Sequence, residues 1–521
     1  MPVKVIIKKS EYYDSVSLMA VAQELSHLPG IDDAAVVMAT EANKGLLKGT
    51  GLLTVEVEKA SPNDLVIAVS GAAQALDQAL QQAEKLLQKK TASMETGTFR
   101  PKSLRGAARA HPDSNLVVIS VTGRYAAAEA WTALQNGLHV LLFSDNVSLE
   151  DEIALKRYAV DHDLLLMGPG AGTAILNNVA LGFANVLPIG PVGIVSAAGT
   201  GLQEVSTLLA RNGVGITQGI GTGGRDLKSE VGGLMMLAGL RALQADPQTR
   251  IILLVSKPPD ASVTARVLAQ IGEGDKPAIV CFLGGDPWEV QAVPNALPAT
   301  TLEEAALLAA RLAGAHLPKI EKILADQDRW CAEQAGKLHP LLKPEQCYLR
   351  GLYSGGTLCY EAQVIWQKLL REPVYSNAPL KSAHRLTDST RSFKNTAVDL
   401  GEEEFTIGRP HPMIDNDLRI RRIMQEANDP ETAVIVLDVV LGYGAHPNPV
   451  AELGLAVRRA RLLAGEAGRE LVFIASVTGT EADPQRLSRQ VKALEEASVV
   501  VCNSNANAAR LAARIIQDRQ A

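Results

Sequence analysis

Aromatic side chains and cysteines are scarce in this sequence. Phe, Trp and Tyr make up 4% of its 521 residues, whereas glycine occurs 43 times. This composition favours tightly packed α/β layers over an aromatic-rich binding surface. The five cysteines include no C-x-x-C pair. Neither a disulfide framework nor a zinc or other metal site is therefore expected, and a reducing cytoplasm fits.

An excess of basic residues is also absent. The net charge is −6 at pH 7 and no basic stripe is visible, which argues against nucleic acid as a partner. The run at 164–203 has no charged residue, but glycines, prolines and asparagines interrupt it. It therefore lacks the roughly 20 consecutive apolar residues of a membrane span. A buried parallel sheet, covered on both faces, explains this run better, so no membrane partner is expected.

Alternating strand and helix patterns predict an α/β fold with doubly wound parallel sheets. The length predicts about three or four domains. We expect a small ferredoxin-like α+β domain at 1–90, a Rossmann-like domain at 113–187, and two flavodoxin-like domains at 188–318 and 346–521. No complete G-x-G-x-x-G follows the first strand of the Rossmann-like region, so a dinucleotide site is not expected.

The last two regions contain an internal repeat. The motif G-T-x-x-x-E occurs at 199–204 and again at 356–361. The pair D-P precedes a predicted strand at 246–247 and again at 429–430. Because matching motifs recur in the same order, the sequence predicts two duplicated doubly wound domains.

The first copy of this motif lies in a predicted strand, turn and helix. The strand ends at Ser196, the turn covers 197–201, and the helix begins near Leu202. Exposed N–H groups and a helix N-terminus attract an anion. The predicted substrate- or phosphate-binding residues are Gly199, Thr200, Gly201, Gly356 and Thr357, with Gly223 and Gly224 in the loop after the next strand. The alternative is a tight turn in which Thr caps the helix.

Two proline-containing loops carry ionisable side chains. Arg409 and His411 lie in one loop, where Arg can hold an anion and His can move a proton near neutral pH. His446 follows a buried strand, at the edge where parallel sheets bind ligands. These three are the predicted catalytic residues, and a His bonded to nearby backbone is the alternative. Asp438 lies inside that strand and needs a partner, with Arg409 and Lys394 as candidates.

The chain resembles two related families. From residue 168 onward it resembles the succinyl-CoA synthetase (ADP-forming acyl-CoA synthetase) superfamily, through I-G-P-V-G-I-V-S at 189–196 and the glycine-rich stretch at 219–224. Over nearly its whole length it resembles the FdrA family, through segments 42–44, 141–147, 401–415 and 437–447. The resemblance implies two CoA-ligase-type domains, CoA as a candidate cofactor, partner subunits and an oligomer.

Features of the synthetases are missing here. Their phosphorylated His stands in a Gly-His-Ala-Gly loop, and a Glu after a strand supports it. The matching strand ends, at 283–288 and 255–259, have no His and no Glu. The glycine-rich CoA fingerprint and an ATP-grasp domain are also absent from this sequence. Phosphohistidine relay by this chain alone is therefore not expected.

The FdrA resemblance implies another group transfer. It points to a subunit of oxamate carbamoyltransferase, which acts with partner subunits on oxamate and carbamoyl phosphate in allantoin (purine nitrogen) catabolism to give oxalurate. Carbamoyl phosphate is already activated, so the transfer needs oxyanion and phosphate donors more than a covalent His. Two alternatives stay open. One is an acyl-CoA synthetase subunit with a separate nucleotide-activating chain, and the other is a non-catalytic scaffold or metabolite sensor.

Overall fold

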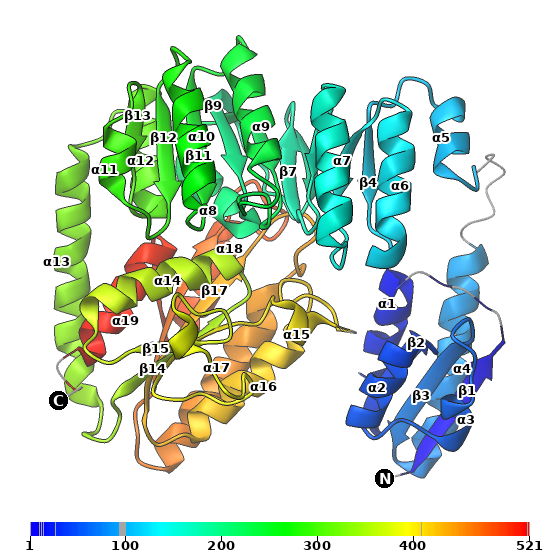
Figure 1. Ribbon diagram of the computed structural model, residues 1–521. Helices are drawn as coiled ribbons and strands as arrows, with labels where there is room; N and C mark the ends of the chain where they lie inside the picture. Colours follow the sequence, from blue (N-terminus) through cyan, green and yellow to red (C-terminus); the bar gives the residue numbers. More distant parts are fainter. Residues whose placement is uncertain are drawn as a thin grey trace. The chain divides into compact units, whose positions relative to one another are not determined.

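Four sheets and the helices around them build the part of the chain that the structure describes (Figure 1). The computed structural model describes residues 2–9, 11, 13, 15–26, 28–92, 101–407, 409–517 and 519. Contacts divide the chain into a smaller unit, residues up to 100 with 406–410, and a larger unit, which contains the rest.

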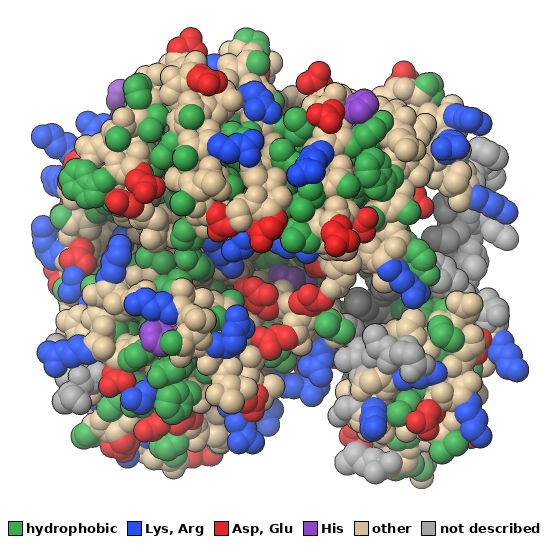
Figure 2. Space-filling view, in the orientation of Figure 1, with side chains coloured by type: hydrophobic (Ala, Val, Ile, Leu, Met, Phe, Trp, Pro, Cys, Tyr) green, Lys and Arg blue, Asp and Glu red, His purple; other side chains and the backbone are tan. Residues whose placement is uncertain are grey.

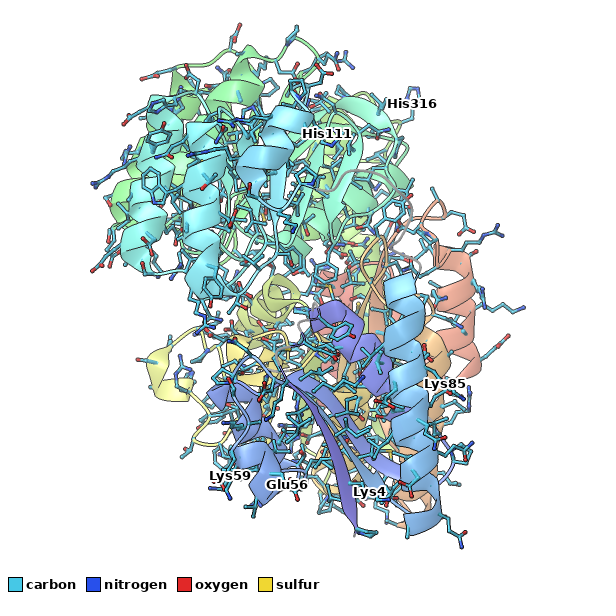
Figure 3. The ribbon with its side chains drawn as sticks, turned by 90° about the vertical axis from the view of Figure 1, so that its right-hand side faces the viewer. Lys4, Glu56, Lys59, Lys85, His111 and His316 are labelled. Carbon is cyan, nitrogen blue, oxygen red and sulfur yellow. The ribbon has the colours of Figure 1, made fainter. Side chains whose placement is uncertain are left out.

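The smaller unit contains a three-stranded antiparallel sheet in the order β1-β3-β2. Helices α1 and α4 cover one face through Leu25 and Leu76, while Leu47 and Val57 lie in a second apolar cluster with residues of β3. Figure 3 shows Lys4 on β1 and Lys85 on α4. The predicted small N-terminal α+β domain is confirmed. Its elements are β1 (Val3–Lys8), α1 (Ser15–Ser26), β2 (Ile31–Met38), α2 (Glu41–Gly49), α3 (Val55–Glu58), β3 (Leu65–Gly71) and α4 (Ala73–Ala92).

The larger unit begins with a parallel three-stranded sheet, β4-β5-β6. The buried ammonium of Lys156, on α7, donates to Glu152 at 2.8 Å and to Asp226 at 2.9 Å. Asp226 also accepts the N–H groups of Met235 and Met236 at the start of α9. These bonds join the small parallel sheet to the next one. The elements of this first part of the larger unit are α5 (Leu104–Ala110), β4 (Leu116–Ile119), α6 (Gly123–Gln135), β5 (His139–Leu142), α7 (Leu149–Asp161) and β6 (Leu166–Met167).

The first repeat is a seven-stranded sheet in the order β13-β12-β11-β9-β10-β7-β8 with helices α8 to α12. Five of its strands are parallel, whereas β7 and β8 form an antiparallel hairpin. Its elements are β7 (Thr173–Leu176), β8 (Val179–Gly182), β9 (Ile189–Ser196), α8 (Gly199–Arg211), β10 (Ile216–Gly221), α9 (Leu234–Ala245), β11 (Ile251–Ser256), α10 (Ala261–Gly272), β12 (Ala278–Phe282), α11 (Pro287–Gln291), β13 (Ala296–Pro298) and α12 (Leu302–Leu312).

Two details of the first repeat differ from the sequence-based expectation. The hairpin β7–β8 comes from residues placed in the preceding domain, and its turn uses Asn177 and Asn178, both with positive φ, as two-residue hairpin turns require. Helix α8 begins at Gly199, not near Leu202. The first-turn N–H groups of α8 therefore belong to Gly199, Thr200 and Gly201, since an α-helix leaves its first N–H groups without an intrahelical partner.

The second repeat is a six-stranded parallel sheet in the order β15-β16-β14-β17-β18-β19 with helices α14 to α19. Helix α13 (Ile320–Leu338) and a short 3₁₀ turn, η1 (His339–Leu341), precede it. Its elements are β14 (Tyr348–Tyr353), α14 (Gly356–Leu369), β15 (Val374–Ser376), the 3₁₀ turn η2 (Ser382–His384), β16 (Asn395–Asp399), α15 (Glu403–Thr406), α16 (Asp417–Asn428), β17 (Thr432–Val440), α17 (Pro449–Glu466), β18 (Val472–Thr478), α18 (Leu487–Glu496), β19 (Val499–Cys502) and α19 (Asn505–Ile516).

Strand order confirms the duplication. Strands β13-β12-β11-β9-β10 occur in the same order as β19-β18-β17-β14-β16. The strand registers match as well, because Gly221 pairs with Ser196 in the first repeat and Asp399 pairs with Tyr353 in the second. Gly221 and Asp399 are therefore equivalent positions.

The two repeats share one hydrophobic core. Leu202 and Leu209 of α8, Trp366 of α14 and Leu511 of α19 belong to a single buried cluster, which also includes residues of α12 and α13. The indole N–H of Trp366 is satisfied by the carbonyl of Ala509 at 2.8 Å. The opposite faces carry separate cores, under α9 and α10 in the first repeat and under α16 and α17 in the second.

Candidate functional site

The two G-T turns of the repeat face each other. A Cβ added to Gly201 would lie 2.9 Å from the methyl carbon of Thr357, and a Cβ added to Gly355 would lie 2.8 Å from that of Thr200. The threonine methyl group of each turn thus lies against a glycine of the other turn. Thr200 and Thr357 are 7% and 4% exposed. The structure thus brings the N-termini of α8 and α14 together in the interior of the larger unit.

The start of α14 already holds a carboxylate of this chain. A Cβ on Gly356 would collide with Asp399, which ends the adjacent strand β16. The Asp399 carboxylate accepts the N–H of Gly401 at 3.0 Å and is 3% exposed. Burial raises the pKa of Asp399 to about 7, the charge of Glu402 adds to this, and Lys257 opposes it. Asp399 therefore lies beside the first residue of α14, and its proton is labile near neutral pH.

The start of α8 differs from that of α14. The equivalent of Asp399 in the first repeat is Gly221, which has no side chain. The nearest atoms to a Cβ on Gly199 belong to Thr173, at 3.3 Å. The residue before α8, Ala198, provides no side-chain cap. Among the residues that the structure describes, no carboxylate lies against the first residue of α8. A carboxylate does lie against the first residue of α14.

His411 lies beside Asp399. Both side chains lie close to Gly401. A Cβ added to Gly401 would be 2.8 Å from Nε2 of His411 and 3.2 Å from a carboxylate oxygen of Asp399. The Nδ1 of His411 accepts the N–H of Met413 at 3.2 Å, so the neutral ring carries its proton on Nε2. Burial lowers the pKa of His411 to about 4, and the charge of Arg419 adds to this. At neutral pH His411 is therefore an uncharged hydrogen-bond donor.

His446 occupies a similar local turn. Its Nδ1 accepts the N–H of Asn448 at 3.0 Å, and its Nε2 lies 3.5 Å from Glu452. Both histidines precede a proline and both accept the N–H two residues ahead. The backbone N–H of His446 donates to the carbonyl of Met413 at 2.8 Å, which ties the two loops together. The catalytic role of His446 stays a prediction.

The remaining predicted residues lie elsewhere. Arg409 is exposed and belongs to the segment 406–410 of the smaller unit, while its neighbour Gly408 lies outside the described residues, so the role of Arg409 also stays a prediction. Gly223 has φ of +84°, and a Cβ there would strike the carbonyl oxygen of Pro169 at 2.6 Å. Gly224 lies close to Ala197, which precedes α8. Gly224 therefore borders the first turn, whereas Gly223 packs against the loop after β6.

The partner predicted for Asp438 is wrong. Lys394 pairs with Glu372 at 2.8 Å. The carboxylate of Asp438 instead accepts the N–H and the hydroxyl of Ser354 at 2.7 and 2.9 Å, and Arg419 lies 3.4 Å away. Strand β17 lies beside β14, so Asp438 is next to the second turn, and the helix that supplies Arg419 packs across both strands. Asp438 therefore fixes the turn that precedes α14.

Lys257 is a candidate that the sequence-based prediction missed. It follows strand β11, and its ammonium lies 5.5 Å from the ring centre of Tyr360 on α14. Its charge acts on Asp399 and Cys359. Lys257 stands in the segment where the synthetases carry a Glu. A positive charge there can stabilise a nearby anion.

Acidic side chains gather in a recess where the two repeats meet (Figure 2). The negative charges of Glu402 and Glu403, which follow β16, act on Asp145 in the loop after β5. Partial burial and the charge of Glu403 raise the pKa of Asp145. The rings of Phe143, Phe183 and His411 form a chain with centroid distances of 5.7 and 5.6 Å. Loops of all three sheets of the larger unit thus converge around Asp399 and His411.

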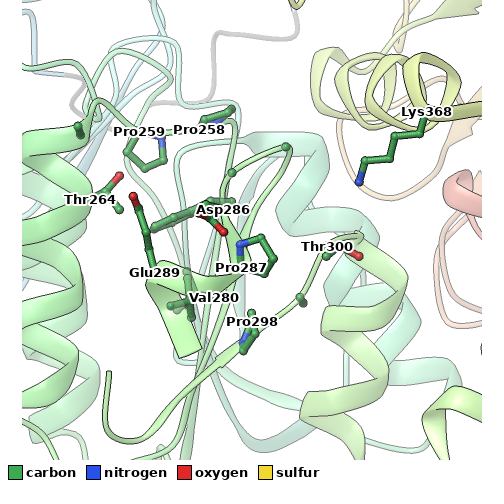
Figure 4. A pocket seen from close by; sticks show the side chains of 16 residues that line it. Pro258, Pro259, Thr264, Val280, Asp286, Pro287, Glu289, Pro298, Thr300 and Lys368 are labelled. Carbon is green, nitrogen blue, oxygen red and sulfur yellow. The ribbon is translucent and has the colours of Figure 1, made fainter. Parts of the chain in front are cut away.

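A separate cleft of about 370 Å³ lies at the carboxyl ends of β11, β12 and β13 (Figure 4). Asp286 and Glu289 lie on one side of it and Lys368 on the other. The loop after β12, which holds the phosphorylated His in the synthetases, is here Gly284-Gly285-Asp286-Pro287. The carboxylate of Asp286 accepts the N–H of Trp288 at 2.9 Å and so begins helix α11. This loop carries no nucleophilic His.

Two family models match this chain. Residues 352–515, within the second repeat, match the model described as CoA-ligase. Residues 1–102 match the model described as AllF, heavy metal-associated domain. The sequence has no cysteine before Cys281, so this region offers no thiolate ligand for a metal.

Curated relatives match at two levels. The uncharacterized protein YahF of Escherichia coli K12 is 45% identical over 522 residues, 99% of each chain. The ADP-forming sulfoacetate-CoA ligase subunit SauD of Bilophila wadsworthia is 23% identical over 190 residues, 35% of this chain and 63% of that protein. The succinate–CoA ligase [ADP-forming] subunit alpha of Staphylococcus epidermidis is 26% identical over 176 residues, 33% of this chain and 57% of that protein.

These findings define a class of protein in which a CoA-ligase-type domain and an AllF-type N-terminal domain occur in one chain. The chain belongs to the FdrA-type family of CoA-ligase-like proteins. Its more distant relatives are subunits of CoA ligases. None of the helices in the described ranges is long and apolar enough to cross a lipid bilayer.

Proposed function

We propose that this chain is a component of a cytoplasmic enzyme that transfers a carbamoyl group from carbamoyl phosphate to oxamate, giving oxalurate. The observation that carries the proposal is the asymmetry of the two turns. No carboxylate lies against the first residue of α8, whereas Asp399 lies against the first residue of α14 and Lys257, which follows β11, acts on Asp399. Such a site suits one substrate anion and one proton acceptor.

The proposed chemistry uses groups that lie near the two turns. The phosphate oxygens of carbamoyl phosphate accept the N–H groups of Gly199, Thr200 and Gly201, and the amide nitrogen of oxamate attacks the carbamoyl carbon. A C–N bond forms, the C–O bond to phosphate breaks, and inorganic phosphate leaves with the electron pair. Asp399 takes the proton of the attacking nitrogen. His411 donates from Nε2 to the carbamoyl oxygen, where negative charge develops.

The absence of a His in the β12 loop also supports this proposal. Carbamoyl phosphate brings its own leaving group, so no phosphoenzyme is needed. Partner subunits would supply the remaining contacts to oxamate, in keeping with relatives that are subunits of larger enzymes.

A second candidate is an acyl-CoA synthetase subunit. The CoA-ligase family model over 352–515 and the ligase relatives favour it. In that case the α8 turn would bind an acyl phosphate, and CoA would be the acceptor. A separate chain would have to activate the acid with nucleotide.

One comparison of reactions separates the candidates. The full chain is assayed alone and together with the proteins encoded beside it, first with oxamate and carbamoyl phosphate and then with succinate, CoA and ATP. We expect oxalurate in the first mixture. A thioester in the second mixture, without oxalurate in the first, would assign the synthetase. If the partner proteins are present and neither product forms, both enzyme hypotheses are wrong and the chain is a non-catalytic scaffold or metabolite sensor.

A further inference from the structure

The glutamates of the two G-T-x-x-x-E motifs make crossed contacts. Glu204, on α8 of the first repeat, accepts the N–H of Asn505 at 3.0 Å, at the start of α19 in the second repeat. Glu361, on α14 of the second repeat, accepts the N–H of Leu302 at 2.7 Å, at the start of α12 in the first repeat. Each acid therefore satisfies an N–H that a helix start leaves unpaired, but on the other repeat.

Asn505 connects the two acids. Its backbone N–H donates to Glu204, and its side-chain amide donates to Glu361 at 2.8 Å and to the carbonyl of Leu358 at 3.0 Å. Leu358 lies in the first turn of α14. One residue thus reaches α8 through its backbone and the beginning of α14 through its side chain.

The link is buried and contains two acids. Glu204 and Glu361 are 2% and 1% exposed, and Asn505 is fully buried. Burial raises the pKa of Glu361 to about 7, while the bonds from Asn505 and Leu302 oppose the shift. The charge of Glu204 adds to it and that of Arg510 opposes it. Two carboxylates bonded to the backbone and the side chain of one asparagine in a low-dielectric interior interact strongly, so displacing one of them alters the other.

We infer that Glu204, Asn505 and Glu361 are positioning residues that couple the two turns, so that an anion bound at the start of α8 stabilises the start of α14 and the Asp399 site. This rests on the anion site of the proposed function. Glu204 lies one helical turn after Thr200, and Glu361 one turn after Thr357. A small shift of α8 towards a bound anion therefore moves Glu204 relative to Asn505, and Asn505 is bonded to Leu358 and Glu361 near the start of α14.

Hydrogen exchange with inorganic phosphate as the probe tests this coupling. Exchange is followed in peptides covering 199–204 and 356–361 of the full chain. In the unsubstituted protein, phosphate is expected to slow exchange at least threefold in both peptides. In Asn505→Ala the effect stays at 199–204 and is lost at 356–361, because the variant removes the side-chain bridge and keeps the backbone bond to Glu204.

Asn507→Ala is the matched control. Asn507 lies on the same helix and also crosses between the repeats, donating to Glu303 at 3.0 Å. It contacts neither turn through that bond, so its variant should respond to phosphate as the unsubstituted chain does. Glu361→Gln is a second test, because it keeps an acceptor for Leu302 and presents an amide N–H to Asn505. Protection at 356–361 that survives in both Asn505→Ala and Glu361→Gln overturns the coupling.

Failure of the anion site is distinguishable from failure of the coupling. If phosphate slows exchange in neither peptide of the unsubstituted chain, the anion site of the proposed function is wrong. The coupling is then tested by measuring hydrogen exchange in the absence of phosphate. Glu204→Ala, on the first repeat, removes the acceptor of the Asn505 N–H and should raise exchange at 356–361 on the second repeat at least threefold, and an unchanged rate there refutes the coupling.

Discussion

The carboxylate of Asp399 lies against Gly356, the first residue of α14. The contact leaves no room for a Cβ at that glycine. It also places a carboxyl group whose pKa is raised by burial to about 7 beside the first turn of a helix of 14 residues. The second G-T turn is therefore an internal carboxylate site.

The first prediction concerns the close contact itself. Gly356→Ala should destabilise the chain by about 1–3 kcal/mol, because the methyl group overlaps Asp399 and the buried strand end cannot move freely. Gly336→Ala is the control, since Gly336 lies inside helix α13 with nothing within 4 Å of its Cβ position. That change should stabilise by about 0.5–1 kcal/mol. Urea unfolding measures both, and equal effects would contradict the contact.

The second prediction concerns the charge of Asp399. If it accepts the proton, the rate should rise with pH through about 7, because only the ionised form is a base. Asp399→Asn should lower turnover by about 10²–10⁴ and remove this limb of the pH profile. A variant that retains the limb would assign the proton transfer to another group.

The same pKa predicts how stability depends on pH. The ordinary value for this carboxyl is 3.8, and it is raised to about 7 in the folded chain. Between these values the folded protein holds a proton that the unfolded chain has lost. The stability contributed by the protonated group is thus complete below pH 3.8 and is lost as pH rises through 7. Asp399→Asn should flatten this decline in a series of melting temperatures, and an unchanged series would count against the raised pKa.

The third prediction concerns His446. His446→Asn keeps an acceptor for the N–H of Asn448, so the turn before α17 should survive. If His446 is the acid or base of the reaction, turnover falls by about 10²–10⁴ with an unchanged circular dichroism spectrum. A wild-type rate would leave His446 with a structural role alone.

The fourth prediction concerns the buried ion pairs of Lys156. Lys156→Ala leaves Glu152 and Asp226 without the ammonium that they share, and both are fully buried. The expected loss is about 3–5 kcal/mol of unfolding free energy. Lys492→Ala serves as the control, because its pair with Glu496 is exposed and should contribute less than about 1 kcal/mol. Similar losses in thermal unfolding would contradict the importance of the buried network.

The fold was largely predictable, because its signals are local or repeated. Uncharged strand runs and two copies of G-T-x-x-x-E were enough to predict two doubly wound domains. The β7–β8 hairpin was missed, although Asn177 and Asn178 between two short apolar runs are a hairpin signal. The predicted domain boundary, between 187 and 188, falls after this hairpin.

The site was only partly predictable. The G-T turns were found from their motif, but Asp399 was not, since its importance depends on β16 lying beside β14, a pairing of strands 42 or more residues apart in sequence. The segment 255–259 lacks the Glu of the synthetases, but its sequence alone does not place Lys257 near Asp399. The partner of Asp438 was sought among nearby basic residues, while the actual one, Arg419, lies on the helix that crosses the sheet. Charge partners across a sheet require the three-dimensional arrangement.

The crossed contacts of Glu204 and Glu361 have a consequence for how the halves of the larger unit can exist. If the chain were cut near α13, each fragment would keep a helix whose first N–H has lost its acceptor and an acid that has lost its donor. Neither fragment could satisfy these groups by itself, and the two would have to reassociate through the same pairs of atoms. The halves are therefore expected to behave as complementing fragments, inert when separate and restored when mixed, and not as two independent modules on a tether.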